Sequence, residues 1–292
     1  MDYKYVNLVY FTGTGGTARV ADAFEQAFLN QSINVHRTEL NGKNQPVDSC
    51  DLLVVIFPVH AFNAPKSIDE WIEQAPPGRG RPVAVISVSG GGEISPNTAC
   101  RAATNQRLKR KGYHVVYEKM FVMPSNFMIK YEDILCAMLL GAAPRNAEKA
   151  VSELLTGICH RTTPFWIDRV ASKLGVLEKI GAKFFGKCLK ANENCINCGW
   201  CAQNCPRGNI TIVNDKITFG GTCVICLRCV YGCSQKAIEP GIGKFLILKG
   251  GFDLRKIENK IGYMTVFPSV EQVTQGSLLK RVKAYLIESG EK

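Results

Sequence analysis

The chain has 292 residues and a formal net charge of +11; 46% of its residues are hydrophobic and 21% are charged, as in ordinary globular proteins. Its longest strongly apolar run, 134–143, is too short to cross a bilayer, which excludes a transmembrane segment. The N-terminus leads directly into an apolar strand pattern at 6–11 without a basic leader, so we expect a cytoplasmic protein.

The first part of the chain alternates strand and helix patterns. We predict strands at 5–11, 33–39, 51–57, 82–88 and 115–122, and helices at 17–29, 68–75 and 98–111. The run 51–57 is apolar at nearly every position, which is typical of a strand buried on both faces. This alternation predicts an α/β fold with a flavodoxin-like, doubly wound, five-stranded parallel sheet.

The rest of the chain changes character twice. Residues 131–189 have only helical patterns, which Pro144, Pro164 and Gly175 are expected to break into pieces. Residues 191–240 are rich in cysteine and turns, with a hairpin pattern at 210–219 and a likeness between their two halves. We therefore predict a first domain at 1–145, a helical connector at 146–190, a small α+β domain at 191–240 and an extension at 241–292 that ends in a helix at 277–287.

Eight of the thirteen cysteines form two arrays with the same spacing. They are Cys195, Cys198, Cys201 and Cys205, and then Cys223, Cys226, Cys229 and Cys233. In a chain of this length without an export signal, cysteines indicate metal or redox chemistry more than disulfides. Zinc is one alternative, but zinc motifs do not need a third and a fourth cysteine at these intervals.

The spacing is instead that of bacterial ferredoxins, in which the fourth cysteine of each array binds the cluster of the other. By that rule the chain holds two [4Fe–4S] clusters. One has the ligands Cys195, Cys198, Cys201 and Cys233, and the other has Cys223, Cys226, Cys229 and Cys205. Pro206 follows the pattern, whereas Ser234 stands where a second proline is usual. Small residues such as Gly199 and Gly232 are expected to let backbone amides approach the sulfurs.

A threonine- and glycine-rich loop follows the first predicted strand, where a doubly wound sheet binds phosphate. Gly13, Gly15 and Ala18 fit a dinucleotide fingerprint, and Glu39 lies where a ribose-binding acid would be. The other interpretation is that the loop wraps a monophosphate, and the loop resembles that of flavodoxins from residue 8 to residue 21. We favour the second interpretation over the dinucleotide site and over a turn that binds nothing. Its residues are Thr12, Gly13, Thr14, Gly15, Gly16 and Thr17.

Two more loops leave the carboxyl ends of the third and fourth strands, where ligands of such sheets lie. The first contains Pro58, Val59, His60, Ala61, Phe62 and Asn63, and the second contains Ser89, Gly90, Gly91 and Gly92. Glycines let the backbone approach a flat ring, and Phe62 is able to pack on it. His60 is interpreted either as a flavin contact or as a structural histidine.

Together these features resemble the EFR-type ferredoxins, which are flavodoxin–ferredoxin fusions of anaerobic bacteria and archaea. The resemblance covers residues 1–130 and 191–240, including the loops above and the stretch 123–127. It implies FMN in the first domain and two [4Fe–4S] clusters in the second. It also implies that Ser125 and Asn126, after the fifth strand, reach the flavin site.

The basic charge is concentrated between 161 and 190, with seven Lys or Arg against two acids. One face of this segment is expected to be buried (Phe165, Trp166, Val170, Leu174, Leu177 and Phe184), with Arg169, Lys173, Lys179, Lys183 and Lys187 toward solvent. The basic face is then either a solvated helix surface or a docking surface for an acidic redox partner. Clusters and FMN would offset much of the net charge, so we expect no nucleic-acid partner.

The combination predicts an iron–sulfur flavoprotein that transfers electrons between low-potential clusters and FMN in anaerobic metabolism. Its partners would be redox proteins: a ferredoxin, a flavodoxin, or a reductase or oxidase. The alternative is an FMN-dependent oxidoreductase that reduces a small organic substrate with electrons derived from ferredoxin. A binding or maturation module with structural clusters is a third class. The oligomeric state is left open.

Overall fold

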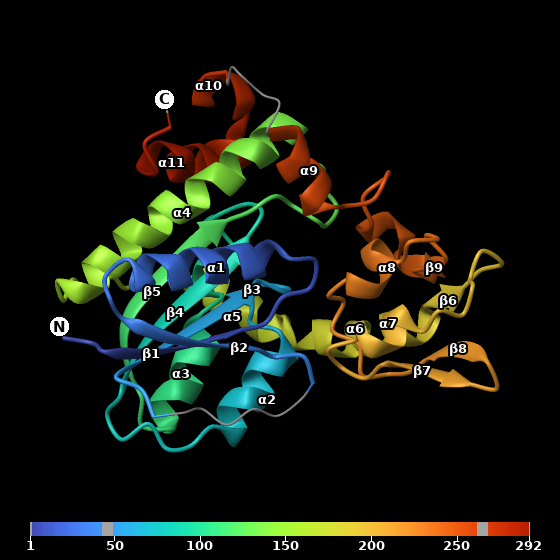
Figure 1. Ribbon diagram of the computed structural model, residues 1–292, viewed down its shortest axis with the longest axis horizontal. Coiled ribbons are helices and arrows are strands. Elements are labelled where there is room, and N and C mark those ends of the chain that lie inside the picture. Colours follow the sequence, from blue (N-terminus) through green and yellow to red (C-terminus); the bar gives the residue numbers. More distant parts are fainter. Residues whose placement is uncertain (1, 43–48, 262–267, 292) are drawn as a thin grey trace.

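A computed structural model describes residues 2–42, 49–261 and 268–291. Its centre is a five-stranded sheet in the order β2-β1-β3-β4-β5, in which every neighbouring pair is parallel (Figure 1). The strands are β1 (Tyr5–Tyr10), β2 (Asn34–Glu39), β3 (Leu52–Pro58), β4 (Pro82–Ser89) and β5 (His114–Val122). This is the flavodoxin-like strand order, and the predicted fold class of this part is confirmed.

Helices cover both faces of the sheet, because alternate side chains of each inner strand are buried on opposite faces. In β3, Leu52, Val54 and Ile56 belong to one hydrophobic core, and Leu53, Val55 and Phe57 belong to the other. The first core also includes α1 (Gly16–Leu29) and α4 (Asp133–Leu155), and the second includes α2 (Lys66–Gln74) and α3 (Ala102–Arg110). The helix predicted at 98–111 begins only at Ala102, after a 3₁₀ turn, η1 (Asn97–Ala99).

The predicted break at Pro144 is wrong, because α4 runs through this proline from Asp133 to Leu155. Proline removes one helical hydrogen bond, but α4 buries a long apolar face against α1 and the sheet. That tertiary packing outweighs the local cost. The other two breaks are confirmed: Pro164 lies between α4 and α5 (Trp166–Leu174), and Gly175 separates α5 from α6 (Val176–Cys188).

The end of the chain packs back on the α1–α4 face of the sheet. It forms α9 (Leu254–Ile261), α10 (Val270–Val273), η3 (Ser277–Leu279) and α11 (Lys280–Glu288), so the predicted terminal helix is confirmed. Val270, Val282 and Leu286 are buried in the same core as the sheet, and the rings of Tyr285 and Phe121 are 6.0 Å apart. The tail therefore completes the hydrophobic core.

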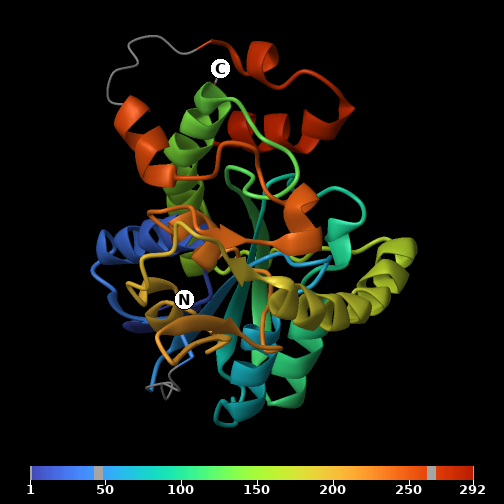
Figure 2. The same cartoon turned by 90° about the vertical axis from the view of Figure 1, so that its right-hand side faces the viewer.

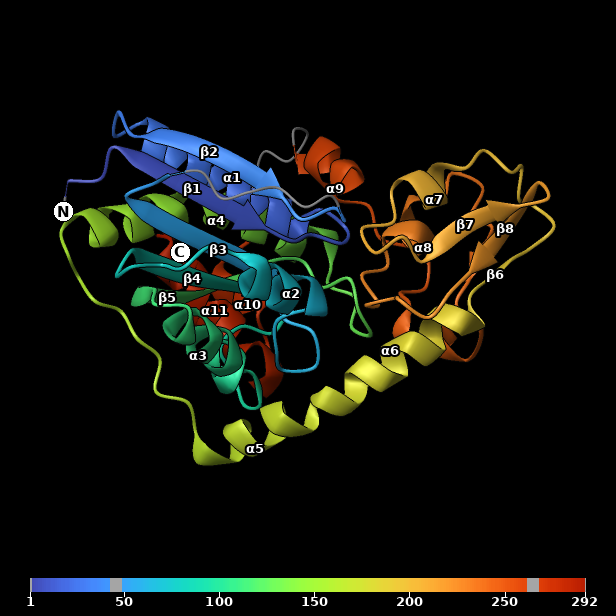
Figure 3. The same ribbon diagram turned by 90° about the horizontal axis from the view of Figure 1, so that it is seen from below.

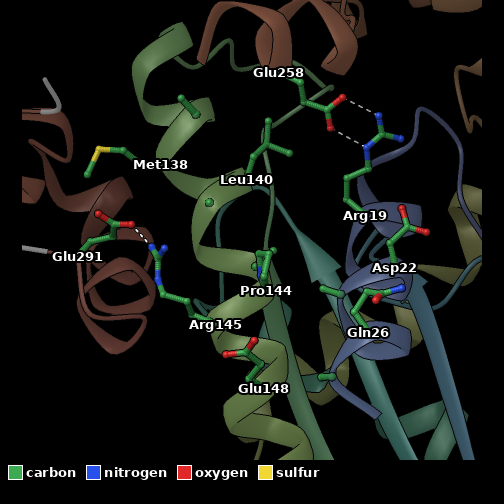
Figure 4. Close-up of a pocket in the computed structure, with 15 residues that line it drawn as sticks. Arg19, Asp22, Gln26, Met138, Leu140, Pro144, Arg145, Glu148, Glu258 and Glu291 are labelled. Atoms are coloured by element: carbon green, nitrogen blue, oxygen red, sulfur yellow. Dashed lines mark hydrogen bonds and ion pairs between the residues drawn. The ribbon is translucent and has the colours of Figure 1, made fainter. Parts of the chain in front are cut away.

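A surface cavity of about 670 Å³ lies among α1, α4 and the tail (Figure 4). Arg19 of α1 and Glu258 of α9 form two parallel bonds of 2.8 Å across its edge, and Arg145 of α4 pairs with Glu291. These ion pairs fix the tail to the helices. None of the residues predicted to bind a cofactor is among the described residues that line this cavity.

The cysteine-rich segment forms a small unit with two short two-stranded sheets. β6 (Lys190–Ala191) pairs with β9 (Ile238–Glu239), and β7 (Ile210–Val213) pairs with β8 (Lys216–Phe219). The β7–β8 hairpin confirms the sequence pattern; its turn residues Asn214 and Asp215 both have positive φ, as in a type I′ turn. The helices of the unit are α7 (Trp200–Gln203) and α8 (Arg228–Gly232), and η2 (Gly241–Leu246) follows. No helix in the described part of the chain is long and apolar enough to span a membrane.

Candidate cofactor site

The two cysteine arrays adopt the same backbone conformation. Asn197 and Ile225, at equivalent positions, both have φ of 52°, and Gly199 and Leu227 have φ of 74° and 60°. A β-branched residue such as Ile225 rarely adopts positive φ, so this conformation is maintained against local strain. The turn directs the amide of Ile225 to the sulfur of Cys223 at 3.3 Å. The sequence repeat is therefore also a repeat in structure.

Four cysteines from the two arrays line one small cavity. They are the ligands predicted for the second cluster, Cys205, Cys223, Cys226 and Cys229. The remaining wall is largely apolar and includes Phe185 and Leu189. Burial raises the pKa of Cys223 to about 12 and also raises that of Cys229. Buried thiols stay protonated in this environment unless a cation compensates for the charge, and metal coordination deprotonates them. This donor set fits a thiolate-bound cluster.

Part of the first predicted ligand set also comes together. Cys201 is buried, and its pKa is raised by desolvation and further by the neighbouring Cys195 and Cys233. Next to Cys233, Gly232 lies under the indole of Trp200 in the first array, where an added β-carbon would be 2.1 Å from the ring. Gly232 thus makes room for the Trp200 ring. Cys198 is exposed.

Within the described residues, no three His, Cys, Asp or Glu side chains are arranged as ligands of a single metal ion. Each thiolate of a four-iron cluster binds a different iron, so cluster ligands surround a cavity and do not converge on a point.

The threonine- and glycine-rich loop connects β1 to α1 at the carboxyl end of the sheet, with Gly15 at φ 99°. Thr12 and Thr17 are buried, and the Thr12 hydroxyl accepts a hydrogen bond of 3.2 Å from the amide of Gly15. The side-chain amide of Asn126 donates to the Thr14 hydroxyl at 2.7 Å. Asn126, one of the two residues that the family resemblance implied, therefore contacts this loop directly.

The loop after β3 is a tight turn from His60 to Asn63. The backbone amide and carbonyl of these two residues pair reciprocally at 2.8 Å, and Ala61 and Phe62 between them have φ of 35° and 64°. Burial lowers the pKa of His60 to about 4, with a backbone hydrogen bond at Val224 opposing the shift. His60 also meets Phe11 edge-on, with ring centroids 6.4 Å apart. His60 is thus a neutral, packed side chain at the pH of a cell.

The loop after β4 is fixed at both ends. The amide of Gly92 donates to the Ser89 hydroxyl at 2.9 Å, and Tyr131 donates to the carbonyl of Gly90 at 2.8 Å. Beyond it, Glu93 pairs with the guanidinium of Arg101, which is only 1% exposed. Arg101 was not predicted, because an arginine in a basic helix carries no sequence signal that it is buried.

The second cysteine array lies directly against the threonine- and glycine-rich loop between β1 and α1. This contact is at the carboxyl ends of β1 and β3 (Figures 1 and 2). A β-carbon on Gly13 would be 2.2 Å from the carbonyl oxygen of Cys226, so the two backbones touch. The guanidinium of Arg228 donates to the carbonyls of Thr12 and Gly13 at 2.7 and 3.1 Å. Neither contact was predicted from the sequence. The two predicted cofactor regions are therefore neighbours.

Contacts on either side keep the cysteine-rich unit in this position. Tyr231 donates to the carbonyl of Asn126 at 2.9 Å, and Arg207 forms an ion pair with Glu70 of α2. Val224, between two cysteines of the second array, is buried in the same core as the sheet.

The connector helices confirm the predicted exposure of the basic residues, because Arg169 and Lys173 of α5 and Lys183 and Lys187 of α6 are exposed. The predicted burial of the apolar residues is wrong. Phe165, Trp166 and Val170 are exposed, and so is Phe184 of α6, although all four were expected to be buried. The side of α5 that faces the protein is polar, because the buried carboxylate of Asp168 accepts hydrogen bonds from two hydroxyls of the 95–98 segment. The side chains of Leu174, Leu177 and Lys179, also part of the prediction, lie outside the described residues.

No model of a known protein family matches the chain, and no curated protein matches it. Among solved structures, the chain is similar to a Fusobacterium nucleatum flavodoxin bound to flavin mononucleotide, with 14% identity over 52% of this chain and 98% of that one and a TM-score of 0.39. It is also similar to general stress protein 14 of Treponema denticola in complex with FMN (14% identity, 52% and 99%, TM-score 0.38). A third similar structure is a flavodoxin from the domain Archaea, with 11% identity over 52% of this chain and 99% of that one and a TM-score of 0.36.

Proposed function

We propose that the chain is an iron–sulfur flavoprotein of the EFR type that transfers electrons between two [4Fe–4S] clusters and FMN. The observation that carries the proposal is the contact between Gly13 and Cys226, because one belongs to the predicted phosphate loop and the other to the predicted ligands of the second cluster. Electron transfer within a chain needs its redox groups close together and in fixed positions. Arg228 and Tyr231 supply that fixation.

In this proposal the loop from Thr12 to Thr17 holds the FMN phosphate, and the loops at 58–63 and 89–92, with Asn126, surround the flavin ring. The ordered hydrogen bonds of these loops at Gly15, Gly92 and Asn63 support a preformed site. Bound flavin supplies one- and two-electron chemistry, and the clusters supply one-electron transfer. A neutral His60 leaves the charge of the site to the phosphate and the clusters.

The cluster ligands in the proposal are the two crossed sets. The cavity lined by Cys205 and the first three cysteines of the second array supports one set, and the proximity of Cys201 to Cys195 and Cys233 supports the other. Backbone amides that point at sulfurs, at Cys223, Cys205 and Cys233, would stabilise the reduced cluster. We further propose that the protein works in the cytoplasm of an anaerobe with a redox protein as partner.

The decisive experiment begins with anaerobic reconstitution of the full chain. We expect about eight iron and eight sulfide per chain, since each cluster holds four of each, and one FMN released by heat. Reduction by a ferredoxin donor, followed in a stopped-flow instrument, should bleach the cluster absorbance before the flavin absorbance. Bound FAD or NAD, or zinc in place of iron, would contradict the proposal. Sustained turnover of added small-molecule acceptors would favour the oxidoreductase alternative over a carrier.

The phosphate loop has its own test. Thr12→Ala combined with Thr17→Ala removes two buried hydroxyls, and we expect FMN retention to weaken by about 1.5–3 kcal/mol for each lost charge-assisted hydrogen bond. Equilibrium dialysis of FMN measures the change. Unchanged FMN affinity would assign the phosphate to another part of the chain.

A further inference from the structure

The helices α5 and α6 run end to end along the outside of the molecule, from the sheet to the cysteine-rich unit (Figure 3). Gly175 between them has helical φ and ψ of −58° and −11°, so the direction of the chain is maintained. Together they form a nearly continuous helical run of roughly 35 Å at the usual helical rise. Both of its ends, as far as their side chains are described, have exposed residues.

The inner face of α5 is polar and already fully engaged. Asp168 is buried and accepts a hydrogen bond from Ser95 at 2.6 Å, and the Ser172 hydroxyl donates to the side chain of Asn63 at 2.7 Å. An added β-carbon on Gly175 would be 2.4 Å from the carbonyl of Ala61. These contacts hold α5 against the predicted flavin loops, and they determine which side of the helix faces outward.

The outer face combines large apolar side chains with basic ones. Among the exposed residues of α5 are Trp166, Arg169, Val170 and Lys173, and among those of α6 are Ile180, Lys183, Phe184 and Lys187. Both sets have the spacing i, i+3, i+4, i+7, which places their members on one side of a helix. The sets begin 14 residues apart, close to four helical turns, so they face nearly the same way.

The exposure of this face is large for a surface helix. Trp166 is 77% exposed, Ile180 is 65% exposed and Phe184 is 57% exposed. An isolated exposed apolar residue needs no explanation, but a row of them along one side of a helical run marks an interaction surface. The side chains at 174 and 176–179, between the two sets, are outside the described residues.

We propose that this outer face of α5 and α6 binds the surface of an anionic lipid membrane. The helical run would lie flat in the headgroup region, with Trp166, Val170, Ile180 and Phe184 inserted among the acyl chains. Tryptophan is a preferred residue at this depth, and a helix with such side chains beside lysines is typical of interfacial attachment. The four cations on the same face match the negative charge of the lipid headgroups.

A membrane accounts for both components of the face, whereas an acidic redox protein accounts for the charge alone. Encounters between redox proteins are brief and small in area, so they do not require a row of buried apolar side chains. Lipid attachment would also have a consequence for the site, because α5 is bonded to Asn63. The flavin loops would be held close to the membrane surface. The proposal does not depend on which cofactors are bound.

The test is flotation of the reconstituted full-length protein with vesicles. We expect it to float with phosphatidylglycerol–phosphatidylcholine vesicles at about 0.1 M salt and to remain in solution with phosphatidylcholine alone. Trp166 fluorescence should be quenched by brominated lipid, and Trp166→Phe should abolish most of this quenching while binding changes by less than about twofold. Trp166→Ser with Phe184→Ser should lower the partition coefficient by about tenfold or more.

A matched variant distinguishes binding through this face from nonspecific binding through other exposed apolar residues. Leu278 and Ile158 are exposed apolar residues outside the connector helices, and replacing both by serine should leave the partition coefficient within about twofold. Absence of binding to the anionic vesicles would overturn the proposal. Binding without quenching of Trp166, or binding that Trp166→Ser with Phe184→Ser leaves unchanged, would overturn it as well. If the same two substitutions instead abolish binding of an acidic ferredoxin while vesicles fail, the face belongs to a protein partner.

Discussion

Arg228 and Glu39 form an ion pair that joins the second cysteine array to the end of β2, with 2.5 Å between Nη2 of Arg228 and Oε1 of Glu39. The same guanidinium donates to two carbonyls of the predicted phosphate loop, those of Thr12 and Gly13. In the dinucleotide interpretation, Glu39 would bind a ribose. Its carboxylate already accepts hydrogen bonds from Arg228 and Tyr10, which favours the monophosphate interpretation of the loop.

This contact predicts the effect of Arg228→Gln on local stability. The shorter neutral side chain loses the ion pair and the two carbonyl acceptors, which together hold the cysteine-rich unit on the sheet. We expect the free energy of opening to fall by about 2 kcal/mol, so that amides around 13–17 exchange hydrogen about 30-fold faster. Hydrogen-exchange mass spectrometry measures this. Arg110→Gln, at an exposed arginine of α3, is the control, and equal exchange in both variants would contradict the prediction.

The sheet was predictable because its signals are local. A strand buried on both faces, such as β3, needs apolar residues at nearly every position, and few other structures have this pattern. The carboxyl ends of parallel strands share one edge of a sheet, so the sequence also predicted that the loops after β1, β3 and β4 leave the same edge. The repeat of the two cysteine arrays was equally clear, because their cysteines have identical spacing in the sequence.

The orientation of α5 was not predictable, because it depends on partners far away in the sequence. Its hydrophobic periodicity predicted that Trp166 and Val170 would be buried. The structure buries Asp168 and Ser172 instead, since Ser95 and Thr98 donate hydrogen bonds to Asp168 and Asn63 accepts one from Ser172. A sequence pattern predicts which residues share a face of a helix. It does not predict which of those faces finds packing and hydrogen-bond partners in the rest of the chain.

The close approach of Gly13 to Cys226 predicts that Gly13→Ala disturbs the site. The added methyl would be 2.2 Å from a carbonyl oxygen, which backbone atoms cannot avoid without moving the two units apart. We expect a loss of about 1–3 kcal/mol in stability, as for overpacked cores, together with slower electron transfer between cluster and flavin. Gly141→Ala in α4 is the control, because its new methyl would meet nothing within 4 Å and the residue lies outside the predicted cofactor loops. Equal effects of the two substitutions would contradict the close contact.

Crossed ligation predicts a specific pattern of cluster loss. Cys233→Ser should damage the cluster of the first array, although Cys233 belongs to the second array in sequence, and Cys205→Ser should damage the cluster of the second. The two clusters can be followed separately by electron paramagnetic resonance of the reduced protein, and each variant should lose about half of its iron, since one of two clusters is destabilised. If Cys233→Ser and Cys205→Ser each damaged the cluster of its own array, the ligation would not be crossed.

The packing of His60 predicts how stability depends on pH. Burial lowers its pKa in the folded protein from the ordinary 6.5 to about 4, so between these values the unfolded chain binds a proton that the folded chain does not. The stabilising contribution of neutral His60 is therefore complete above pH 6.5 and is lost as the pH falls toward 4. His60→Gln removes this dependence, and we expect the difference in unfolding free energy between about pH 7 and about pH 5 to be smaller in the variant than in the natural chain. Urea unfolding under anaerobic conditions measures both values. His114, exposed at the start of β5, provides the control: His114→Gln should keep the full dependence, and a His60→Gln variant that did the same would show that His60 is not desolvated.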